Sequence, residues 1–517
     1  MSNNSNRPKP LVVVILDGLG VAPPSPGNAV SLSKTPNLDM LWPKYPHGYL
    51  HASGLHVGLP NGVDGNSEVG HMNLGAGKVI FQELPRIDAS VENGTFADNQ
   101  ELIKAFEVSK TGNVHIIGLV GNGQVHSSYG HLVALLEMAQ KHKINGDNVY
   151  IHVFTDGRDS PPQGAAKILE RLQVEMERTR VGKIATLIGR YNAMDRDERW
   201  ERTKKAYDLM VSATGQKVND WQEALNDSYS KNVNDEYLEA YVITDKKGNP
   251  LATIKEGDAV IFFNYRADRA VQITRAFEDE NFPGWEREII KNLYFVGLTN
   301  YEKGFPKIQA FPPDKINAPF GKVVSDNGLR QLRISESEKY PHVTYFYNGG
   351  NQVQYPGEDH IEVPSPRDIA TYDQKPEMSA IPLTELVIQK INEGNYDVII
   401  INYANPDMVA HTGVIDATVK AMEITDNCVG RLVDVVLEKN GVLLITADHG
   451  NAEEMIDPQT GNVDTKHSTN PVPIMIINND FDTRELPFGI LADVTPTCLA
   501  LLGIPKPIEM TGRDLMV

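Results

Sequence analysis

The 517-residue sequence contains only two cysteines, Cys428 and Cys498, and it is short of basic residues. So few cysteines exclude a small disulfide-stapled secreted fold and are typical of a reducing compartment. Both lie in apolar, helical-looking stretches, which favours buried packing thiols over a functional pair. Lysine and arginine number 49 against 68 aspartates and glutamates, so the formal net charge is −19. That charge argues against general binding to nucleic acid or anionic membranes, and an anionic ligand would need cationic side chains concentrated locally.

Long apolar runs are also absent. No run approaches the roughly 20 residues that a membrane-spanning helix needs. The N-terminal stretch MSNNSNRPKP lacks the apolar core of a signal peptide. We therefore expect a cytoplasmic protein that does not contact membranes. The length suggests two to four domains, and 41% hydrophobic with 23% charged residues is ordinary for a globular protein.

What the sequence does contain is a series of short apolar runs rich in β-branched residues. Runs that are apolar on both faces are typical of parallel strands covered by helices on each side. Helical patterns alternate with them, as in residues 161–178, where we expect Ser160 to cap a helix with Pro161 in its first turn. This alternation predicts an α/β fold. The predicted strands are LVVVIL (11–16), VHIIGLV (114–120), VYIHVF (149–154), IATLI (184–188), AVIFF (259–263), DVIII (397–401), VLLIT (442–446) and PIMII (473–477).

Acidic residues follow three of these predicted strands. LVVVIL runs into Asp17, DVIIINYANP into Asp407, and VLLITA into Asp448. Ligands of open α/β sheets bind beyond the carboxyl ends of the strands, so we expect the three acids to face one crevice. If the three strands share a sheet, the segment between them forms an inserted domain. We expect that domain at 82–315, with 1–81 and 316–517 forming the other.

A metal site is the chemistry that these residue types indicate. Asp407 and His411 are four residues apart, which places both on one face of a helical turn. Mixed carboxylate and imidazole ligands suit manganese or zinc better than calcium. The candidate ligands are too many for one tetrahedral ion and natural for two: Asp17, Ser67, Asp407, His411, Asp448, His449 and His467.

Ser67 lies in GNSEVGH (65–71), a short stretch framed by glycines, as an exposed hydroxyl on a tight turn would be. A serine hydroxyl is a poor nucleophile at neutral pH, but a metal ion can lower its pKa, and two ions can clamp both ends of a phosphoryl transfer. Taken singly, these residues have plainer interpretations. A DxxxH pair is common on solvated helices, and Asp17 or Ser67 could simply cap a helix.

A second group of polar residues follows strands of the middle segment. Arginine binds carboxylate and phosphate through two parallel hydrogen bonds. Several arginines at strand ends therefore indicate an anion pocket, although single surface arginines are usually just solvated. His126, in GNGQVHSSYGH, either joins this pocket or caps a helix. The group comprises Arg158 and Asp159 after VYIHVF, Arg190 and Arg196 after IATLI, and Arg266 and Arg269 after AVIFF.

Nine stretches, in order along nearly the whole chain, resemble the cofactor-independent (2,3-bisphosphoglycerate-independent) phosphoglycerate mutases of the alkaline phosphatase superfamily. They are VVVILDGLG, GNSEVGHMNLGAG, FTDGRDSPP, GRYNAMDRDERW, FFNYRADRA, SEKYPHVTYFYNGG, NYANPDMVAHTG, TADHGNAEEM and HSTNPVPIMI. The resemblance implies an alkaline-phosphatase-like α/β/α domain with a second α/β phosphotransferase domain inserted into it. It also implies two divalent metal ions, with manganese expected, no bisphosphoglycerate cofactor, and a monomer.

By motif, the resemblance assigns one metal ion to Asp407, His411 and His467. It assigns the other to Asp17, Asp448 and His449, with Ser67 as oxygen ligand and nucleophile. It also implies catalytic roles for Asp159 and Lys339. The residues alone would not select Lys339, because SESEK reads equally well as a charged loop. The residues implied to bind phosphoglycerate are His126, Arg158, Asp159, Arg190, Arg196, Arg266, Arg269 and Lys339.

The reaction that the resemblance implies interconverts 3-phosphoglycerate and 2-phosphoglycerate in glycolysis and gluconeogenesis. Ser67 would take the phosphoryl group, the glycerate would reorient, and its other hydroxyl, deprotonated by Asp159, would attack the phosphoserine. A two-domain cleft that closes would exclude water. Two alternatives stay open. A metal-dependent phosphatase or phosphopentomutase of the same superfamily is disfavoured by the middle arginines, and a non-catalytic metal-dependent binding protein is disfavoured by the intact nucleophile.

Overall fold

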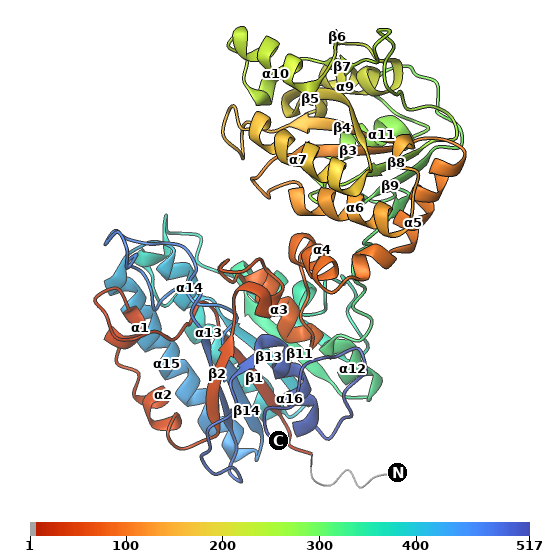
Figure 1. Cartoon of the computed structure of the whole chain (residues 1–517). Helices are drawn as coiled ribbons and strands as arrows, with labels where there is room; N and C mark the ends of the chain where they lie inside the picture. Colours follow the sequence, from red (N-terminus) through yellow and green to blue (C-terminus); the bar gives the residue numbers. More distant parts are fainter. Residues whose placement is uncertain (1–6) are drawn as a thin grey trace. The chain divides into compact units, whose positions relative to one another are not determined.

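The computed structural model describes residues 7–517, which divide into two compact units. The larger unit contains the described residues up to Gln82 together with Lys315–Val517, and the inserted unit is Glu83–Asp314. Each unit has its own sheet with helices around it (Figure 1). This confirms the predicted α/β class, with a second α/β unit inserted into the first. The residues MSNNSN, part of the stretch expected to lack a signal peptide, lie outside the described residues.

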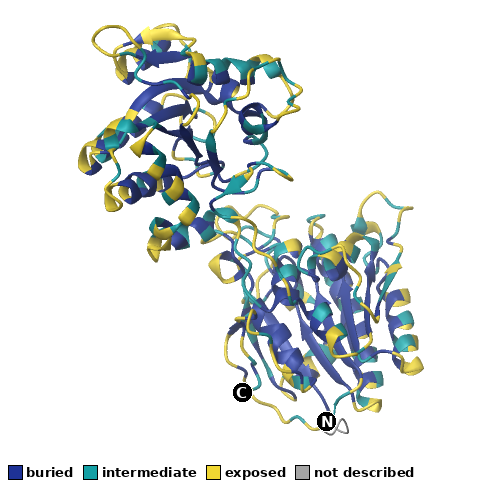
Figure 2. Ribbon diagram, turned by 90° about the vertical axis from the view of Figure 1, so that its right-hand side faces the viewer, coloured by how far each residue is buried: buried dark blue, intermediate teal, exposed yellow. Residues whose placement is uncertain are grey.

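The sheet of the larger unit runs in the order β12-β11-β13-β1-β14-β15-β2-β16. Its central strands β13, β1 and β14 are parallel, and all of their residues are buried (Figure 2). Burial on both faces is the reason why these strands read as continuous apolar runs. The strands are β1 Leu11–Leu16, β2 His47–His51, β11 Gln331–Glu336, β12 Glu358–Val363, β13 Val398–Tyr403, β14 Val442–Thr446, β15 Val472–Ile477 and β16 Gly489–Ile490.

Two groups of helices cover this sheet, on opposite faces in Figure 1. Helices α1, α2, α13 and α14 pack against the long helix α15, whereas α12 and α16 pack against α3. The helices are α1 Ala29–Leu32, α2 Pro36–Leu41, α3 Ser67–Ala76, α12 Phe320–Asp326, α13 Ala380–Glu393, α14 Asn405–Ala410, α15 Ile415–Glu438 and α16 Val494–Leu501. Cys428 lies in α15 and Cys498 in α16, and both are buried, as predicted for packing thiols.

Two strands at one side of this sheet differ from the sequence-based expectation. The run PIMII was predicted as a parallel strand, but β15 pairs antiparallel with β14 and with β2. A parallel connection needs a crossover element, and residues 447–471, which join β14 to β15, contain no helix. Strand β2 was not predicted, because HGYLH is short and alternates between buried and half-buried positions.

The inserted unit has a sheet in the order β10-β9-β8-β3-β4-β5-β7-β6, parallel except where β7 pairs with β5. Its strands are β3 Val114–Val120, β4 Val149–Thr155, β5 Lys183–Gly189, β6 Gln216–Val218, β7 Tyr241–Ile243, β8 Ala259–Phe262, β9 Tyr294–Gly297 and β10 Ile308–Gln309. Its helices are α4 Glu83–Glu92, α5 Gln100–Glu107, α6 Tyr129–Lys141, α7 Ala165–Thr179, α8 Arg190–Ala193, α9 Trp200–Ser212, α10 Trp221–Ser230 and α11 Val271–Glu278.

Helix α7 begins later than the sequence predicted. It starts at Ala165 with Gly164 as N-cap, so Ser160 does not cap it and the prolines precede its first turn. The Ser160 hydroxyl instead donates to Asp156 Oδ2 over 2.7 Å and accepts a hydrogen bond from the backbone of Asn122.

None of the helices of residues 7–517 is both long and apolar enough to cross a bilayer.

Candidate active site

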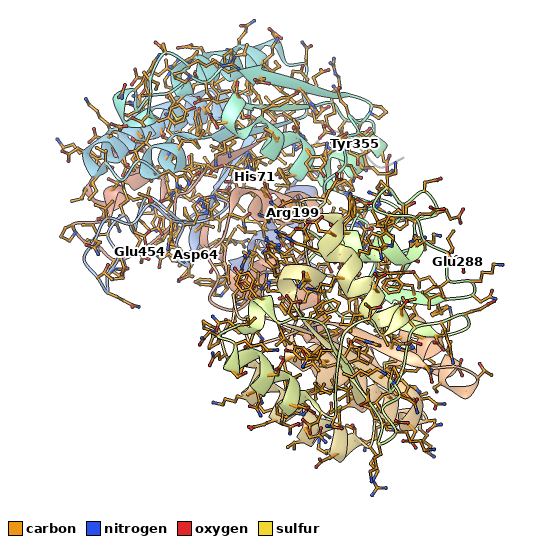
Figure 3. The ribbon with its side chains drawn as sticks, turned by 90° about the horizontal axis from the view of Figure 1, so that it is seen from above. Asp64, His71, Arg199, Glu288, Tyr355 and Glu454 are labelled. Carbon is orange, nitrogen blue, oxygen red and sulfur yellow. The ribbon has the colours of Figure 1, made fainter. Side chains whose placement is uncertain are left out.

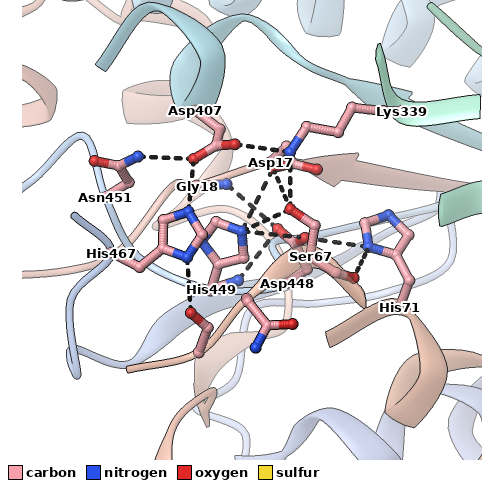
Figure 4. Close-up of polar contacts among 12 residues, drawn as sticks. Asp17, Gly18, Ser67, His71, Lys339, Asp407, Asp448, His449, Asn451 and His467 are labelled. Carbon is pink, nitrogen blue, oxygen red and sulfur yellow. Dashed lines mark hydrogen bonds and ion pairs between the residues drawn. The ribbon is translucent and has the colours of Figure 1, made fainter. Parts of the chain in front are cut away.

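The three acids that follow the central strands lie together. Asp17 follows β1, Asp448 follows β14 after one alanine, and Asp407 lies in the short helix α14 after β13. Because β1 is paired in register with both β13 and β14, the carboxyl ends of the three strands meet at one edge of the sheet. Figure 4 shows the side chains of the three acids together. All three carboxylates are at most 1% exposed. Buried carboxylates need a compensating charge or hydrogen-bond donors.

Lys339 supplies part of this compensation. It ends the short helix Ser337–Lys339 after β11 and is buried. Its Nζ lies 2.6 Å from Asp17 Oδ1, 2.7 Å from Asp407 Oδ2 and 2.8 Å from Ser67 Oγ. Burial alone would lower the pKa of Lys339, but the facing carboxylates of Asp17 and Asp407 raise it above its usual value. The lysine is therefore a fixed cation between two acids and a serine.

Ser67 is the first residue of α3 and is buried, so the prediction of an exposed hydroxyl on a tight turn was wrong. Ser67 also does not cap the helix. Asn66 is the N-cap and accepts a hydrogen bond from the backbone of Val69 over 3.0 Å, so the Ser67 hydroxyl is free for other partners. Ser67 Oγ lies 2.9 Å from His449 Nε2 and 3.3 Å from Asp17 Oδ1. With Lys339 on its other side, the hydroxyl lies where basic, acidic and cationic side chains converge.

Gly65 and Gly70 allow this close packing. A Cβ on Gly65 would lie 2.2 Å from the carbonyl oxygen of Ala52, and a Cβ on Gly70 would lie 2.6 Å from the carbonyl oxygen of Asp448. Any side chain at either position would push the serine away from the strand ends.

Two histidines share one oxygen of Asp407. His411 Nε2 lies 3.2 Å and His467 Nε2 lies 3.4 Å from Asp407 Oδ1, and the two nitrogens are 3.1 Å apart. The Nδ1 atoms contact backbone carbonyls, that of Thr465 for His411 over 2.7 Å and that of Gly65 for His467 over 2.8 Å. A carbonyl accepts only from an N–H, so both Nε2 atoms of the neutral rings carry lone pairs that face each other and a carboxylate.

Charges within the group shift its pKa values when only protons are bound. The hydrogen bond to Asp407 raises the pKa of His411. Burial would lower the pKa of His467, but its hydrogen bond to Asp407 raises it overall. Burial would also raise the pKa of Asp407, yet Lys339 and the two histidines hold it well below its usual range. Asp407 is therefore ionised and attracts positive charge to this point.

A second group of possible ligand atoms surrounds His449, which is fully buried. Its Nε2 is 3.6 Å from Asp17 Oδ1 and 3.5 Å from Asp448 Oδ2. Asp448 Oδ2 also lies 3.1 Å from His71 Nδ1, but that nitrogen is directed to the carbonyl of Ser67 over 2.9 Å. Among residues 7–517, no donor is aimed at Asp448 Oδ2, which is buried. An unpartnered, buried carboxylate oxygen of this kind suits a cation.

Several residues of this site were missed by sequence reasoning. Asn402 Nδ2 donates to Asp17 Oδ2 over 2.7 Å and contacts His71 Nε2 over 3.0 Å, and Asn451 Nδ2 donates to Asp407 Oδ1 over 2.7 Å. These amides and His71 orient the acids, as residues behind metal ligands commonly do. The only sequence signal was their place beside the ligands, Asn402 in INYANPD and Asn451 in DHGN.

The arginines of the middle segment gather in the inserted unit. Arg190 opens α8, and its Nη1 donates to Asp156 Oδ1 over 2.6 Å and to Asp159 Oδ2 over 2.5 Å. Arg158 pairs with Glu236 over 2.6 Å. A pocket of about 180 Å³ is lined by the predicted Arg158, Arg190, Arg196 and Arg269 and by Arg199 and Arg202, which were not predicted.

Asp268 links the remaining predicted residues of this unit. Its carboxylate lies 3.0 Å from Arg266 Nε, 3.2 Å from Arg196 Nη1 and 3.4 Å from His126 Nδ1. His126 Nε2 is 4.0 Å from Asp159 Oδ2. Burial, with the positive charge of Arg190, lowers the pKa of His126 to about 4, so the ring is neutral at pH 7. Asp268, like Asp156 and Glu236, was not predicted as a site residue.

Comparison with known proteins identifies the family. A sequence profile described as the N-terminus of BPG-independent PGAM matches residues 87–303. A 2,3-bisphosphoglycerate-independent phosphoglycerate mutase of Clostridium beijerinckii is 50% identical over 512 residues, which cover 98% of this chain and 99% of that protein. One of Acetivibrio thermocellus is 49% identical, covering 99% of this chain and all of its own length. The chain belongs to the 2,3-bisphosphoglycerate-independent phosphoglycerate mutase family.

A solved structure agrees with this family assignment. A crystal structure of Leishmania mexicana phosphoglycerate mutase at low cobalt concentration matches with a TM-score of 0.54 and 32% identity, covering 99% of this chain and 98% of that one. The resemblance seen in the nine sequence stretches is thereby confirmed. In this member of the family, the donor groups also fit divalent metal ions. Asp407, His411 and His467 form one compact set of ligand atoms, and Asp17 forms others with Asp407 and His449 and with His71 and Asp448.

Proposed function

We propose that this protein is a phosphoglycerate mutase that interconverts 3-phosphoglycerate and 2-phosphoglycerate, a step of glycolysis and gluconeogenesis, without bisphosphoglycerate. The observation that carries this proposal is the position of Ser67 Oγ, 2.8 Å from Lys339 Nζ and 2.9 Å from His449 Nε2, in a chain of this family. A hydroxyl held between a cation and an imidazole is suited to nucleophilic attack. In this proposal Ser67 carries the phosphoryl group between the two positions of the glycerate.

The metal ions of the proposal are two divalent ions, with Mn²⁺ as the expected species. Asp407, His411 and His467 would hold one, and Asp17, Asp448 and His449 with Ser67 would hold the other. Carboxylate and imidazole ligands suit manganese and zinc. Bound ions would supply positive charge that lowers the pKa of the serine hydroxyl and stabilises charge on the phosphoryl group.

The larger unit would carry the nucleophilic half of the reaction. Lys339 donates a hydrogen bond to Ser67 Oγ, and its charge favours the anionic form of that oxygen. As the serine oxygen forms a bond to phosphorus, the bond from phosphorus to the glycerate oxygen breaks. His71 accepts a hydrogen bond from Asn402, whose amide also binds Asp17, so the acid beside the serine keeps its orientation.

The inserted unit would bind the glycerate and move its protons. Its arginines bind the carboxylate, since a guanidinium fork matches two carboxylate oxygens. Asp159 would take the proton of the other hydroxyl as that oxygen attacks phosphoserine and pass it to the oxygen that has lost the phosphoryl group, so that no proton is gained or lost overall. The hydrogen bond from Arg190 holds Asp159 in place. His126, neutral at pH 7, would serve as a hydrogen-bonding group and not as a cation.

The test is turnover of 3-phosphoglycerate without bisphosphoglycerate, with the phosphoenzyme sought by mass spectrometry. The native protein should form 2-phosphoglycerate and show phosphate on Ser67, whereas Ser67→Ala should do neither. Ser31→Ala, which changes an exposed serine of the same unit, is the matched control. Release of inorganic phosphate in place of 2-phosphoglycerate would identify a phosphatase, and turnover by Ser67→Ala would exclude the phosphoserine route.

We further propose that the protein is a cytoplasmic monomer with a small-molecule substrate and no nucleic-acid or membrane partner. The sparse cysteines and the net charge of −19 support this proposal. Size-exclusion chromatography with light scattering tests the oligomeric state directly.

A further inference from the structure

Glu453 lies behind the metal-ligand groups, four residues after His449, and is only 1% exposed. Its carboxylate accepts hydrogen bonds from four donors. Oε2 accepts from the backbone N–H of Gly20 over 3.0 Å and of Asn451 over 2.8 Å. Oε1 accepts from the Asn470 side-chain amide over 3.1 Å and from the Ser468 hydroxyl. Each carboxylate oxygen of Glu453 thus accepts two hydrogen bonds.

These donors belong to three stretches of the chain, two of which lie in the long connection from β14 to β15, and each stretch carries a candidate metal ligand. Gly20 is in the turn after β1 that begins with Asp17. Asn451 follows Asp448 and His449 in the loop after β14. Ser468 follows His467 directly, before β15. One carboxylate therefore fixes the mutual spacing of ligands that the chain supplies from residues 17, 448–449 and 467.

Two glycines make room for this carboxylate. A Cβ on Gly20 would lie 2.4 Å from both carboxylate oxygens of Glu453, and a Cβ on Gly450 would lie 2.4 Å from Oε1. Side chains at these positions would drive the carboxylate out of its place. Gly20 of DGLG and Gly450 of DHGN are therefore explained by Glu453 and not by turn geometry, since neither of these two glycines has a left-handed φ angle.

No cation neutralises Glu453. Within residues 7–517, no lysine, arginine or histidine lies within ion-pair distance of its carboxylate, so its charge is balanced only by neutral donors. Burying a carboxylate without a partner charge lowers the stability of the fold, so its retention indicates that its hydrogen bonds have a function. Orienting the loops that hold a cation is such a function, because groups behind metal ligands commonly fix their geometry.

We propose that Glu453 is a positioning residue that holds the metal-ligand loops in the spacing required for divalent-ion binding. This inference rests on the proposed metal-dependent function and adds a residue to it. Replacement by glutamine keeps the size but puts an N–H₂ group opposite either the two backbone N–H donors or the Ser468 and Asn470 donors. At least one of the three stretches then loses its acceptor, and the candidate ligand that it carries is no longer held.

The experiment compares Glu453→Gln with Glu454→Gln by titrating Mn²⁺ into the metal-stripped full-length proteins in a calorimeter. Glu454 is the neighbouring carboxylate, labelled beside Asp64 in Figure 3, and it is only half-buried. It shares one donor with Glu453, the Asn470 amide, over 3.3 Å, so its variant removes the same charge and leaves all four hydrogen bonds of Glu453 in place. We expect Glu453→Gln to weaken Mn²⁺ binding about 10- to 100-fold, and Glu454→Gln to leave it within about twofold of the native protein.

The alternative results are distinguishable. Native affinity in a folded Glu453→Gln protein would overturn the inference, and equal weakening by both variants would assign the effect to charge alone and overturn it as well. A native protein that does not bind the ion would instead contradict the proposed function.

If Glu453→Gln does not fold, as judged by circular dichroism of the metal-free protein, Ser468→Ala takes its place. That change removes one of the four hydrogen-bond donors to Glu453, and it should weaken Mn²⁺ binding by on the order of tenfold. Unchanged affinity would then overturn the inference.

Discussion

The Nε2 atoms of His411 and His467 lie 3.1 Å apart, and both face Oδ1 of Asp407. Since each Nδ1 donates a hydrogen bond to a backbone carbonyl, the lone pairs of both Nε2 atoms point at the same position. In the protein without bound ions, the hydrogen bond to Asp407 raises the pKa of His411, and it raises that of His467 against the effect of burial, so protons are attracted to this point. A divalent ion suits this point better, because it accepts both lone pairs and the carboxylate together.

Replacing His411 by alanine should therefore weaken binding of Mn²⁺ at least tenfold, because one of the converging nitrogens is lost. Calorimetric titration measures this change. The variant should also lose most of the thermal stabilisation by Mn²⁺, since an ion at 100 times its dissociation constant adds about 2.7 kcal/mol to the free energy of unfolding. His56→Ala, which alters an exposed histidine of the same unit, should change neither quantity. An undiminished thermal shift in His411→Ala would remove His411 from the site.

Lys339→Met should separate ion binding from turnover. The ammonium group lies within 2.7 Å of carboxylate oxygens of both Asp17 and Asp407, so it competes with bound cations for the same charges. Its removal should leave Mn²⁺ affinity equal or tighter while kcat falls on the order of 100-fold or more, because an oriented donor to Ser67 is lost. Parallel calorimetry and 3-phosphoglycerate turnover measure the two effects. A loss of affinity equal to the loss of turnover would make Lys339 only a structural support.

Asp156→Asn should impair substrate binding without affecting metal content. The pair of Asp156 and Arg190 is buried, each residue being 3% exposed, and Asp156 also accepts from the backbone of Asp159 over 3.1 Å. A charge-assisted hydrogen bond contributes about 1.5–3 kcal/mol, so the KM for 3-phosphoglycerate should rise roughly 10- to 100-fold. Asp208→Asn, which alters a half-buried acid on α9, is the control. If KM stayed constant while bound Mn²⁺ fell, Asp156 would not act on the substrate site.

The predicted strands were recognisable because the centre of each sheet is buried on both faces, so β1 is apolar throughout and β13 and β14 have polar residues only near their carboxyl ends, at Asn402 and Thr446. Strand β2 lies near one side of its sheet and alternates, and its five residues give too short a pattern. The direction of β15 depends on a connection without a helix, which the run PIMII itself does not encode.

The candidate ligand residues could be selected from the sequence because acids and histidines beside strand ends are a local pattern. Glu453, His71 and Asp156 were not, since what each does depends on partners from other loops. Glu453 acquires its role only when Gly20 and Ser468 lie beside it in the fold. Glutamates in a sequence such as NAEEM are usually solvated, and nothing local distinguishes the buried Glu453 from the half-buried Glu454.

Glu336 should make the stability of the larger unit fall as the pH rises. It is fully buried at the end of β11, and burial raises the pKa of its carboxyl from 4.5 to about 7. Between these values the folded chain binds more protons than the unfolded chain, so the free energy of unfolding decreases with increasing pH, by up to about 3 kcal/mol in total. Glu336→Gln should therefore match the native protein near pH 5 and be more stable at pH 8.

The measurement is urea unfolding of both metal-free proteins across this range. Glu338→Gln, which changes an exposed neighbour, should follow the native curve. Native and Glu336→Gln curves that stay parallel from pH 5 to pH 8 would show that the carboxyl does not titrate in this window.

The place of β1 in its sheet has a consequence for how the protein is made. The strand LVVVIL is synthesised first, but its hydrogen-bonding partners begin at Val398 and Val442, after the whole inserted unit. At translation rates of about 5–20 residues per second, β1 waits roughly 20 to 80 s for its first neighbour. An unpaired apolar strand of this kind is a site for aggregation. We therefore expect the nascent chain to need shielding of β1, by the ribosome surface or by chaperones, until the last quarter of the polypeptide emerges.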